Sequence, residues 1–180
     1  MKKTSYKVAL GGVISALSLV SMFMSSVIPT AEYAIPAFAG MLLIVLVIEI
    51  NLKWAFATYI CVSILSLLIV PNREASLLFV VFMGYYPIVK SIIESKIKTF
   101  VSWLVKLGVF NVALVAYYTL IKYLVASSDL LDSFDEYEKY IIVLLGVAAN
   151  VVFVIYDIAM TNVISMYMNW LRKKISRYIK

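Results

Sequence analysis

The feature that most restricts the fold of this chain is a series of six nearly uncharged apolar stretches, separated by short segments that carry the charges. Each stretch approaches the roughly 20 residues that a helix needs to cross a bilayer. Because lipid offers no hydrogen-bond partner to backbone N–H and C=O groups, each stretch should form a helix that satisfies its own. A membrane β-barrel would show short segments of alternating polarity, and these stretches do not alternate. The pattern therefore predicts an all-α, polytopic membrane protein.

Prolines, charges and turn residues mark the expected ends of six membrane-spanning helices. We expect these at about 8–28, 33–50, 54–70, 77–93, 101–125 and 140–163, followed by a basic C-terminal segment over 166–180. Spans and loops use nearly all of the 180 residues, so we predict one membrane domain over 1–180. The first apolar run is too long for the core of a signal peptide, and we expect it to be retained. The C-terminal segment either projects into the cytoplasm or lies along the membrane surface.

Lysine and arginine assign the two sides of the membrane. If the N-terminus lies in the cytoplasm, 13 of the 16 lysines and arginines fall on that side, and only Arg73, Lys122 and Lys139 fall outside. Cytoplasmic loops of membrane proteins carry this excess of positive charge. The asymmetry predicts that both termini are cytoplasmic, and the composition suggests a bacterial inner membrane. Topology also explains the basic charge better than nucleic-acid binding does.

Several kinds of chemistry are excluded by the residues that are missing. The chain has no histidine and one cysteine, Cys61, so an internal disulfide, a histidine metal site and histidine-dependent catalysis are impossible. We find no phosphate-binding loop, no catalytic carboxylate pair and no nucleophile elbow. The sequence therefore predicts no enzymatic activity, no cofactor and no metal site.

Polar residues follow one face of each of the last two spans. In the fifth span these are Gly108, Asn111, Tyr118 and Lys122. In the sixth span they are Gly146, Asn150, Asp157 and Thr161. Because polar groups in a membrane normally face the bundle interior, we expect the two stripes to wall a water-accessible hollow open to the exterior. The alternative is that Asn111 and Asn150 only form hydrogen bonds between helices.

A second set of charges is expected in the cytoplasmic half of the membrane. It consists of Lys90, Lys106 and Asp157. An unpaired carboxylate in lipid is strongly unfavourable, so Asp157 should pair with Lys90 or Lys106, or be neutral. We expect this set to be structural. Pro87, in the middle of the fourth span, should kink the helix, either for packing or to shape the floor of a cavity.

The first span carries small residues in place of polar ones. Gly12 and Ala16, with Ala9 one turn earlier, form one small-residue stripe, and Gly11 and Ser15 form an overlapping one. Small residues four apart let another helix approach closely. Two overlapping pairs give a wider flat surface than one intramolecular contact needs, which suggests a docking face for another membrane protein.

These features resemble the substrate-binding (S) component of energy-coupling factor (ECF) transporters. The likeness covers the whole chain in architecture: about 180 residues, six helices and both ends inside. Its most specific local element is the first helix, where the family has an Ala-x-x-x-Ala motif that docks on a transmembrane coupling subunit. Here Gly12 and Ala16 have that spacing, and the first position is glycine instead of alanine.

The resemblance implies a subunit that captures a small micronutrient, such as a vitamin or related heterocycle, from outside the cell. It implies two kinds of partner, the coupling subunit and, through it, two cytoplasmic ATPases that drive release of the substrate inside. Carried onto this chain, the substrate-binding residues would be Glu32, Tyr33, Arg73, Glu74, Asn111, Tyr118, Lys122 and Asn150. The nickel and cobalt members of the family use histidine, which this chain lacks.

A different class of protein also fits the sequence. The membrane protein that organises rod-shaped cell-wall synthesis is similarly small, with a comparable number of helices, and is a non-transporting scaffold. In such a protein the polar stripes would hold helices together, and the basic C-terminal segment would recruit a partner or anionic lipid. A membrane assembly factor or an immunity-type membrane protein is a third possibility.

Overall fold

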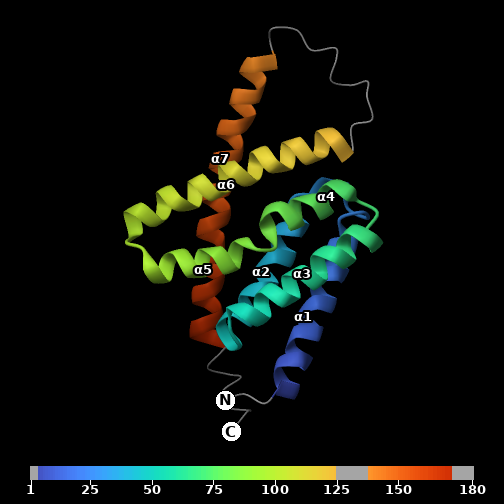
Figure 1. The fold of residues 1–180 in the computed structure, drawn as a ribbon, viewed down its shortest axis with the longest axis vertical. Coiled ribbons are helices and arrows are strands. Elements are labelled where there is room, and N and C mark those ends of the chain that lie inside the picture. The colour runs from blue at the N-terminus through green and yellow to red at the C-terminus, as the bar shows by residue number, and fades with distance from the viewer. Residues whose placement is uncertain (1–3, 125–137, 172–180) are drawn as a thin grey trace. The chain divides into compact units, whose positions relative to one another are not determined.

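The computed structural model describes residues 4–124 and 138–171, and every regular element among them is helical (Figure 1). The elements in chain order are α1 (Thr4–Met24), η1 (Pro29–Ala31), α2 (Ala34–Glu49), α3 (Leu52–Ile69), α4 (Arg73–Leu78), η2 (Phe79–Met83), α5 (Tyr86–Lys96), α6 (Thr99–Leu124), α7 (Glu138–Met166) and η3 (Tyr167–Leu171). The prediction of an all-α chain is confirmed for these residues.

The chain divides into two compact units after Asp135. The first unit contains α1 to α6, and the second contains α7 and its π-helical end η3. The prediction of a single domain over 1–180 stays a prediction, since the structure defines each unit by itself.

Five of the described helical segments are long and apolar enough to cross a membrane. They are Thr4–Met24, Leu52–Ile69, Arg73–Lys96, Thr99–Ile121 and Leu144–Trp170. One further helix, α2, is also apolar, but with 16 residues it is shorter than these five segments. This set of helices is compatible with a multi-pass membrane protein.

Capping side chains explain why two helices begin before their apolar runs. Asn51 precedes α3 and accepts a hydrogen bond from the backbone N–H of Trp54 at 3.0 Å. Asn72 precedes α4 and accepts one from the N–H of Ala75, also at 3.0 Å. Asparagine satisfies an otherwise unpaired donor at a helix start. The third span therefore begins two residues earlier than expected, and the fourth begins at Arg73 instead of residue 77.

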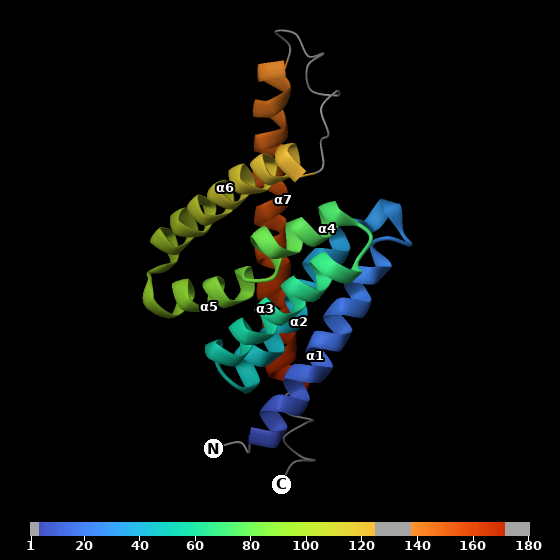
Figure 2. The ribbon, with the colours of Figure 1, turned by 45° about the vertical axis from the view of Figure 1, so that its right-hand side comes forward.

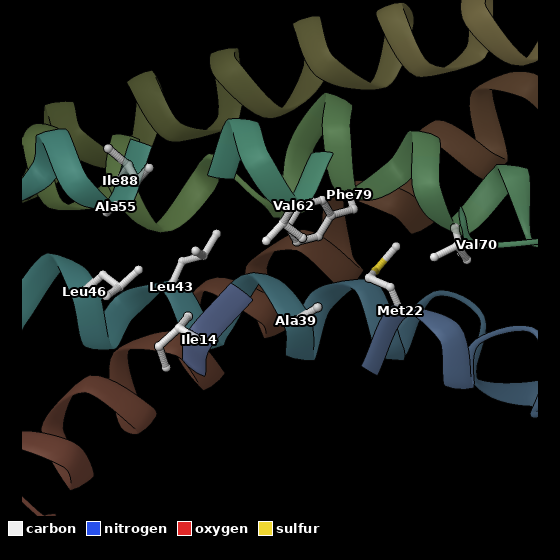
Figure 3. Packing of buried hydrophobic residues seen from close by; sticks show 11 residues of the cluster. Ile14, Met22, Ala39, Leu43, Leu46, Ala55, Val62, Val70, Phe79 and Ile88 are labelled. Carbon is white, nitrogen blue, oxygen red and sulfur yellow. The ribbon is translucent and has the colours of Figure 1, made fainter. Parts of the chain in front are cut away.

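Helices α1, α2 and α3 pack against one another around an apolar core, which also receives side chains from α4, η2 and α5. Figure 3 shows this core from close by, with Ile14 and Met22 of α1 opposite residues of α2 and α3. Its members are Ile14, Met22, Ala39, Leu43, Leu46, Ala55, Val62, Val70, Ala75, Phe79 and Ile88. The core fixes the first three helices and the fourth span as one body.

The fourth span is interrupted between α4 and α5, as the green ribbon in Figure 1 shows. In the π-helical turn η2 the N–H of Gly84 donates to the carbonyl of Phe79 at 2.8 Å, five residues back instead of four. The carbonyl of Val80 thereby loses its regular donor, and the Tyr59 hydroxyl of α3 donates to it at 2.7 Å. The interruption thus lies just before Pro87, where a kink is expected, and a neighbouring helix satisfies a backbone group that the π-helical turn frees.

Two glycines let other groups approach the interrupted span closely. A Cβ atom on Gly40 of α2 would overlap the carbonyl oxygen of Met83 and lie 2.8 Å from its carbonyl carbon. Pro87 lacks the N–H that this carbonyl, four residues earlier, would otherwise accept from. A Cβ on Gly84 would lie 2.6 Å from the ring of Tyr59. These contacts support packing as the role of the kink.

After α5 the chain reverses, and α6 runs back along α5, η2 and α4 (Figure 2). The face of α6 that packs on them carries Lys106, Phe110, Ala113 and Tyr117. The phenyl rings of Phe110 and Phe82 lie edge to face, 5.2 Å between centroids. Residues at spacings of four, three and four lie on one side of an α-helix, so this contact surface is continuous.

Candidate ligand-binding and docking surfaces

One end of the first unit is built where the connection from α1 to α2 meets the start of α4. The backbone N–H of Asn72 donates to the Ser26 hydroxyl at 3.2 Å, and its side-chain amide donates to the Ser25 carbonyl at 3.5 Å. The Ser76 hydroxyl of α4 donates to the Ser66 carbonyl of α3 at 3.2 Å. The two bonds from Asn72 join segments that are far apart in the sequence, and all three bonds fix the start of α4.

Four polar side chains from three segments gather at this end, and we call them the Glu74 cluster. They are Glu32 and Tyr33 from the connection before α2, Glu74 from α4 and Tyr117 from α6. The Tyr117 hydroxyl donates to the backbone carbonyl of Glu74 at 3.4 Å. The hydroxyl of Tyr33 interacts with the carboxylates of both Glu32 and Glu74. The cluster thus combines two carboxylates with two aromatic hydroxyl groups.

Tyr33 stays protonated in this environment. Desolvation of its hydroxyl, followed by the charges of Glu32 and Glu74, raises its pKa above the ordinary value of 10.0. A raised tyrosine pKa favours the neutral form at every pH up to that value, so the hydroxyl remains a hydrogen-bond donor under physiological conditions. Beside two carboxylates, such a donor can orient a polar ligand while the ring supplies an apolar surface.

The structure places the other predicted substrate-binding residues apart from this cluster. The Arg73 guanidinium donates to the Leu67 carbonyl of α3. Asn111 and Tyr118 lie on the exposed side of α6, and the Asn111 amide donates to the Leu107 carbonyl of its own helix at 2.8 Å. Asn150 is in the second unit, where its amide donates to the Gly146 carbonyl at 2.8 Å. The Lys122 side chain lies outside the described residues, and a hollow between α6 and α7 stays a prediction.

The small residues of α1 divide between two sides of the helix. Gly11 is buried, and a Cβ there would stand 3.5 Å from the Thr58 hydroxyl of α3. Ala9, Gly12 and Ala16, which we call the α1 stripe, are exposed. A Cβ on Gly12 would meet no atom within 4 Å. Internal packing therefore uses the Gly11 side and leaves the α1 stripe open.

Two lysines expected to be structural share a partner that the sequence analysis did not name. Glu94 of α5 accepts from Lys90 of the same helix at 2.8 Å and from Lys106 of α6 at 3.0 Å, both at one carboxylate oxygen. The Lys106 ammonium also lies 4.5 Å from the ring centre of Trp103. We call Lys90, Glu94 and Lys106 the Lys90 cluster. The expected pairing of Asp157 with one of these lysines stays a prediction, since Asp157 belongs to the other unit.

Two residues of these clusters were missed as site residues, although the sequence contains a signal for each. Glu94 follows Lys90 by four residues, the spacing of an ion pair on one helix face. Tyr117 follows Lys106 by 11 residues, or about three helical turns, and so shares its face. The prediction singled out Tyr118, one residue further on, which the structure places on the exposed side.

Comparison with known proteins gives no relative from which a role could be transferred: no family model, no curated protein and no solved structure matches this chain.

Proposed function

We propose that this protein is the membrane-embedded substrate-capture subunit of an ECF-type importer, without enzymatic activity of its own. The observation that carries the proposal is the division of the small residues on α1. Gly11 packs inward, whereas Gly12 leaves open space on a helix that has already buried its inner face. An open small-residue surface on a membrane helix is suited to close contact with another helix.

The proposed topology has six spans and both termini in the cytoplasm. The fourth span consists of α4, η2 and α5 together, because the interruption lies within one apolar segment from Arg73 to Lys96. Helix α2 is the short span, since its 16 residues cover roughly 24 Å at 1.5 Å per residue. Local thinning of the bilayer and polar residues at the helix ends accommodate a span of this length. The excess of lysine and arginine on one side sets the orientation.

In this topology the Glu74 cluster faces the cell exterior. Its carboxylates and tyrosines come from the first external connection, from the start of α4 just after the second, and from the outer half of α6. The proposed substrate is a small polar molecule with a planar or apolar part that tyrosine rings can cover. That Asn111, Tyr118, Lys122 and Asn150 also contact the substrate stays a prediction from the sequence.

The proposed partners are a transmembrane coupling subunit on the α1 stripe and two cytoplasmic ATPases bound through it. The test is to purify the tagged, full-length protein from its native membranes and identify co-purifying proteins by mass spectrometry. We expect a pair of ATPases with phosphate-binding loops and one polytopic protein. The variant Gly12→Leu with Ala16→Leu should fold normally and lose all three, because bulky side chains would fill the open stripe.

The control is Val13→Leu with Leu17→Phe, which adds volume at exposed α1 positions beside the stripe and should keep the partners. The docking role is wrong if the Gly12 and Ala16 variant keeps them too. Co-purification of cell-wall synthesis proteins, with no ATPase, would instead identify the scaffold function.

A further inference from the structure

We infer that the π-helical turn of η2 absorbs one spare residue, so that α4 and α5 keep the relative rotation with which both halves of the fourth span face α6, and that Tyr59 satisfies the Val80 carbonyl that this turn frees. The inference concerns the geometry of the first unit and holds whether or not the protein captures a substrate.

Helix α6 presents a single, uninterrupted face to the fourth span. Lys106, Phe110 and Tyr117 lie within about 40° of one another around its axis, at roughly 100° per residue. Each has a partner in the fourth span: Glu94 at 3.0 Å, Phe82 at 5.2 Å between ring centroids, and the Glu74 carbonyl at 3.4 Å. The fourth span must therefore direct all three partners toward one neighbour.

A regular helix over the fourth span would not direct all three partners toward α6. Over the 20 residues from Glu74 to Glu94, a continuous α-helix would place the two glutamates roughly 200° apart, on opposite sides. One residue absorbed by a π-helical turn reduces the angle to about 100°. An arc of this width can contact one helix, through the Glu74 carbonyl at one end and through the long side chains of Glu94 and Lys106 at the other. The turn in η2 supplies this correction.

The extra residue leaves one backbone carbonyl without its regular donor, and a neighbouring helix supplies another donor. Because Gly84 donates to Phe79, the carbonyl of Val80 is left outside the regular pattern, and the Tyr59 hydroxyl donates to it. If Val81 were deleted, Gly84 would stand four residues after Phe79 and could keep the same acceptor. The Val80 carbonyl would then face the N–H of Tyr85. Tyr59 would no longer be needed there.

The experiment deletes Val81 from the full-length chain in a Cys61→Ser background, with Glu74→Cys and Tyr117→Cys as reporters. A thiol-specific crosslinker should join the reporters to the same extent with and without the deletion. Inserting one alanine after Ser76, outside η2, is the matched control and should abolish crosslinking, because it rotates Glu74 away from α6. Loss of the crosslink after the deletion, or failure of the deleted chain to fold, would overturn the inference.

A second measurement tests the role of Tyr59 by the melting temperature in detergent. Tyr59→Phe should lower the melting temperature of the full-length protein and leave that of the Val81-deleted protein unchanged. An equal loss in both proteins would show that Tyr59 acts through packing alone and would contradict its assigned role.

Discussion

At the scale of single residues, the surroundings of the glycines show which helix faces are closely packed and which are open. Gly40 has no space for a side chain because the Met83 carbonyl lies over it, whereas Gly12 has open space. We expect Gly40→Ala to lower the free energy of unfolding by about 3 kcal/mol, the upper range for overpacking against a rigid group. The matched Gly12→Ala should leave it unchanged or raise it by up to about 1 kcal/mol, the helix-propensity gain. Thermal unfolding followed by tryptophan fluorescence measures both.

The sequence could predict the kind of residue at these positions but not their surroundings. The spacing of the small residues on α1 predicts a docking face, and that role stays a prediction; the structure shows open space at Gly12. The spacing could not show that Gly11 rather than Gly12 faces α3, because adjacent stripes on a helix look alike until a neighbour is placed. The close packing of Gly40 could not be predicted from the sequence, because its contact is with a backbone carbonyl 43 residues later in the chain.

At the scale of helices, the Lys90 cluster joins α5 to α6. Glu94 accepts from two buried lysines, so its charge stabilises both. Removing one partner of a buried ion pair leaves an uncompensated charge, which costs several kcal/mol when burial is complete. Since Glu94 is 40% exposed, we expect Glu94→Gln to cost roughly 2 kcal/mol, reduced by solvent screening. The free energy of unfolding in denaturant measures this cost.

The control for this prediction is Lys96→Gln, which removes an exposed charge from the same helix and should change stability by less than about 0.5 kcal/mol. Equal stability of the Glu94→Gln variant and the unchanged protein would show that the cluster does not join the two helices.

Hydrophobicity predicted where helices occur, and local chemistry decided where they begin and end. The apolar runs predicted α1, α3 and α6 within a few residues. The starts of α3 and α4 depend on the asparagine caps before them, and α1 ends at Met24, before the expected proline. The π-helical turn could not be predicted from hydropathy, because it depends on contacts with Gly40 and Tyr59 of other helices.

At the scale of the whole molecule, the proposed topology can be tested by labelling. In a Cys61→Ser background, a cysteine at the exposed Thr30 should react with a membrane-impermeant maleimide in intact cells. A cysteine at the exposed Lys98 should react only after the cells are opened, because the proposed topology places it in the cytoplasm. The reverse pattern would contradict the orientation, and labelling of both from outside would contradict the number of spans.

The candidate site was only partly predictable, because its residues come from segments that meet in space. Glu32, Tyr33 and Glu74 were predicted and do come together. Arg73, beside Glu74 in sequence, instead donates to a carbonyl of α3. Helical periodicity could group residues along α6, but it could not tell which of its faces packs on α4 and α5.

The most direct test of the capture function is native mass spectrometry of the full-length protein, purified from its native membranes in mild detergent. We predict a bound small molecule of constant mass on the unchanged protein. Tyr117→Phe combined with Glu74→Gln should lose it, because both substitutions fall in the Glu74 cluster. The docking variant Gly12→Leu with Ala16→Leu should keep it, since the α1 stripe is a separate surface. Absence of a bound small molecule from every sample, or a ligand that stays bound when the Glu74 cluster is changed, would contradict the account.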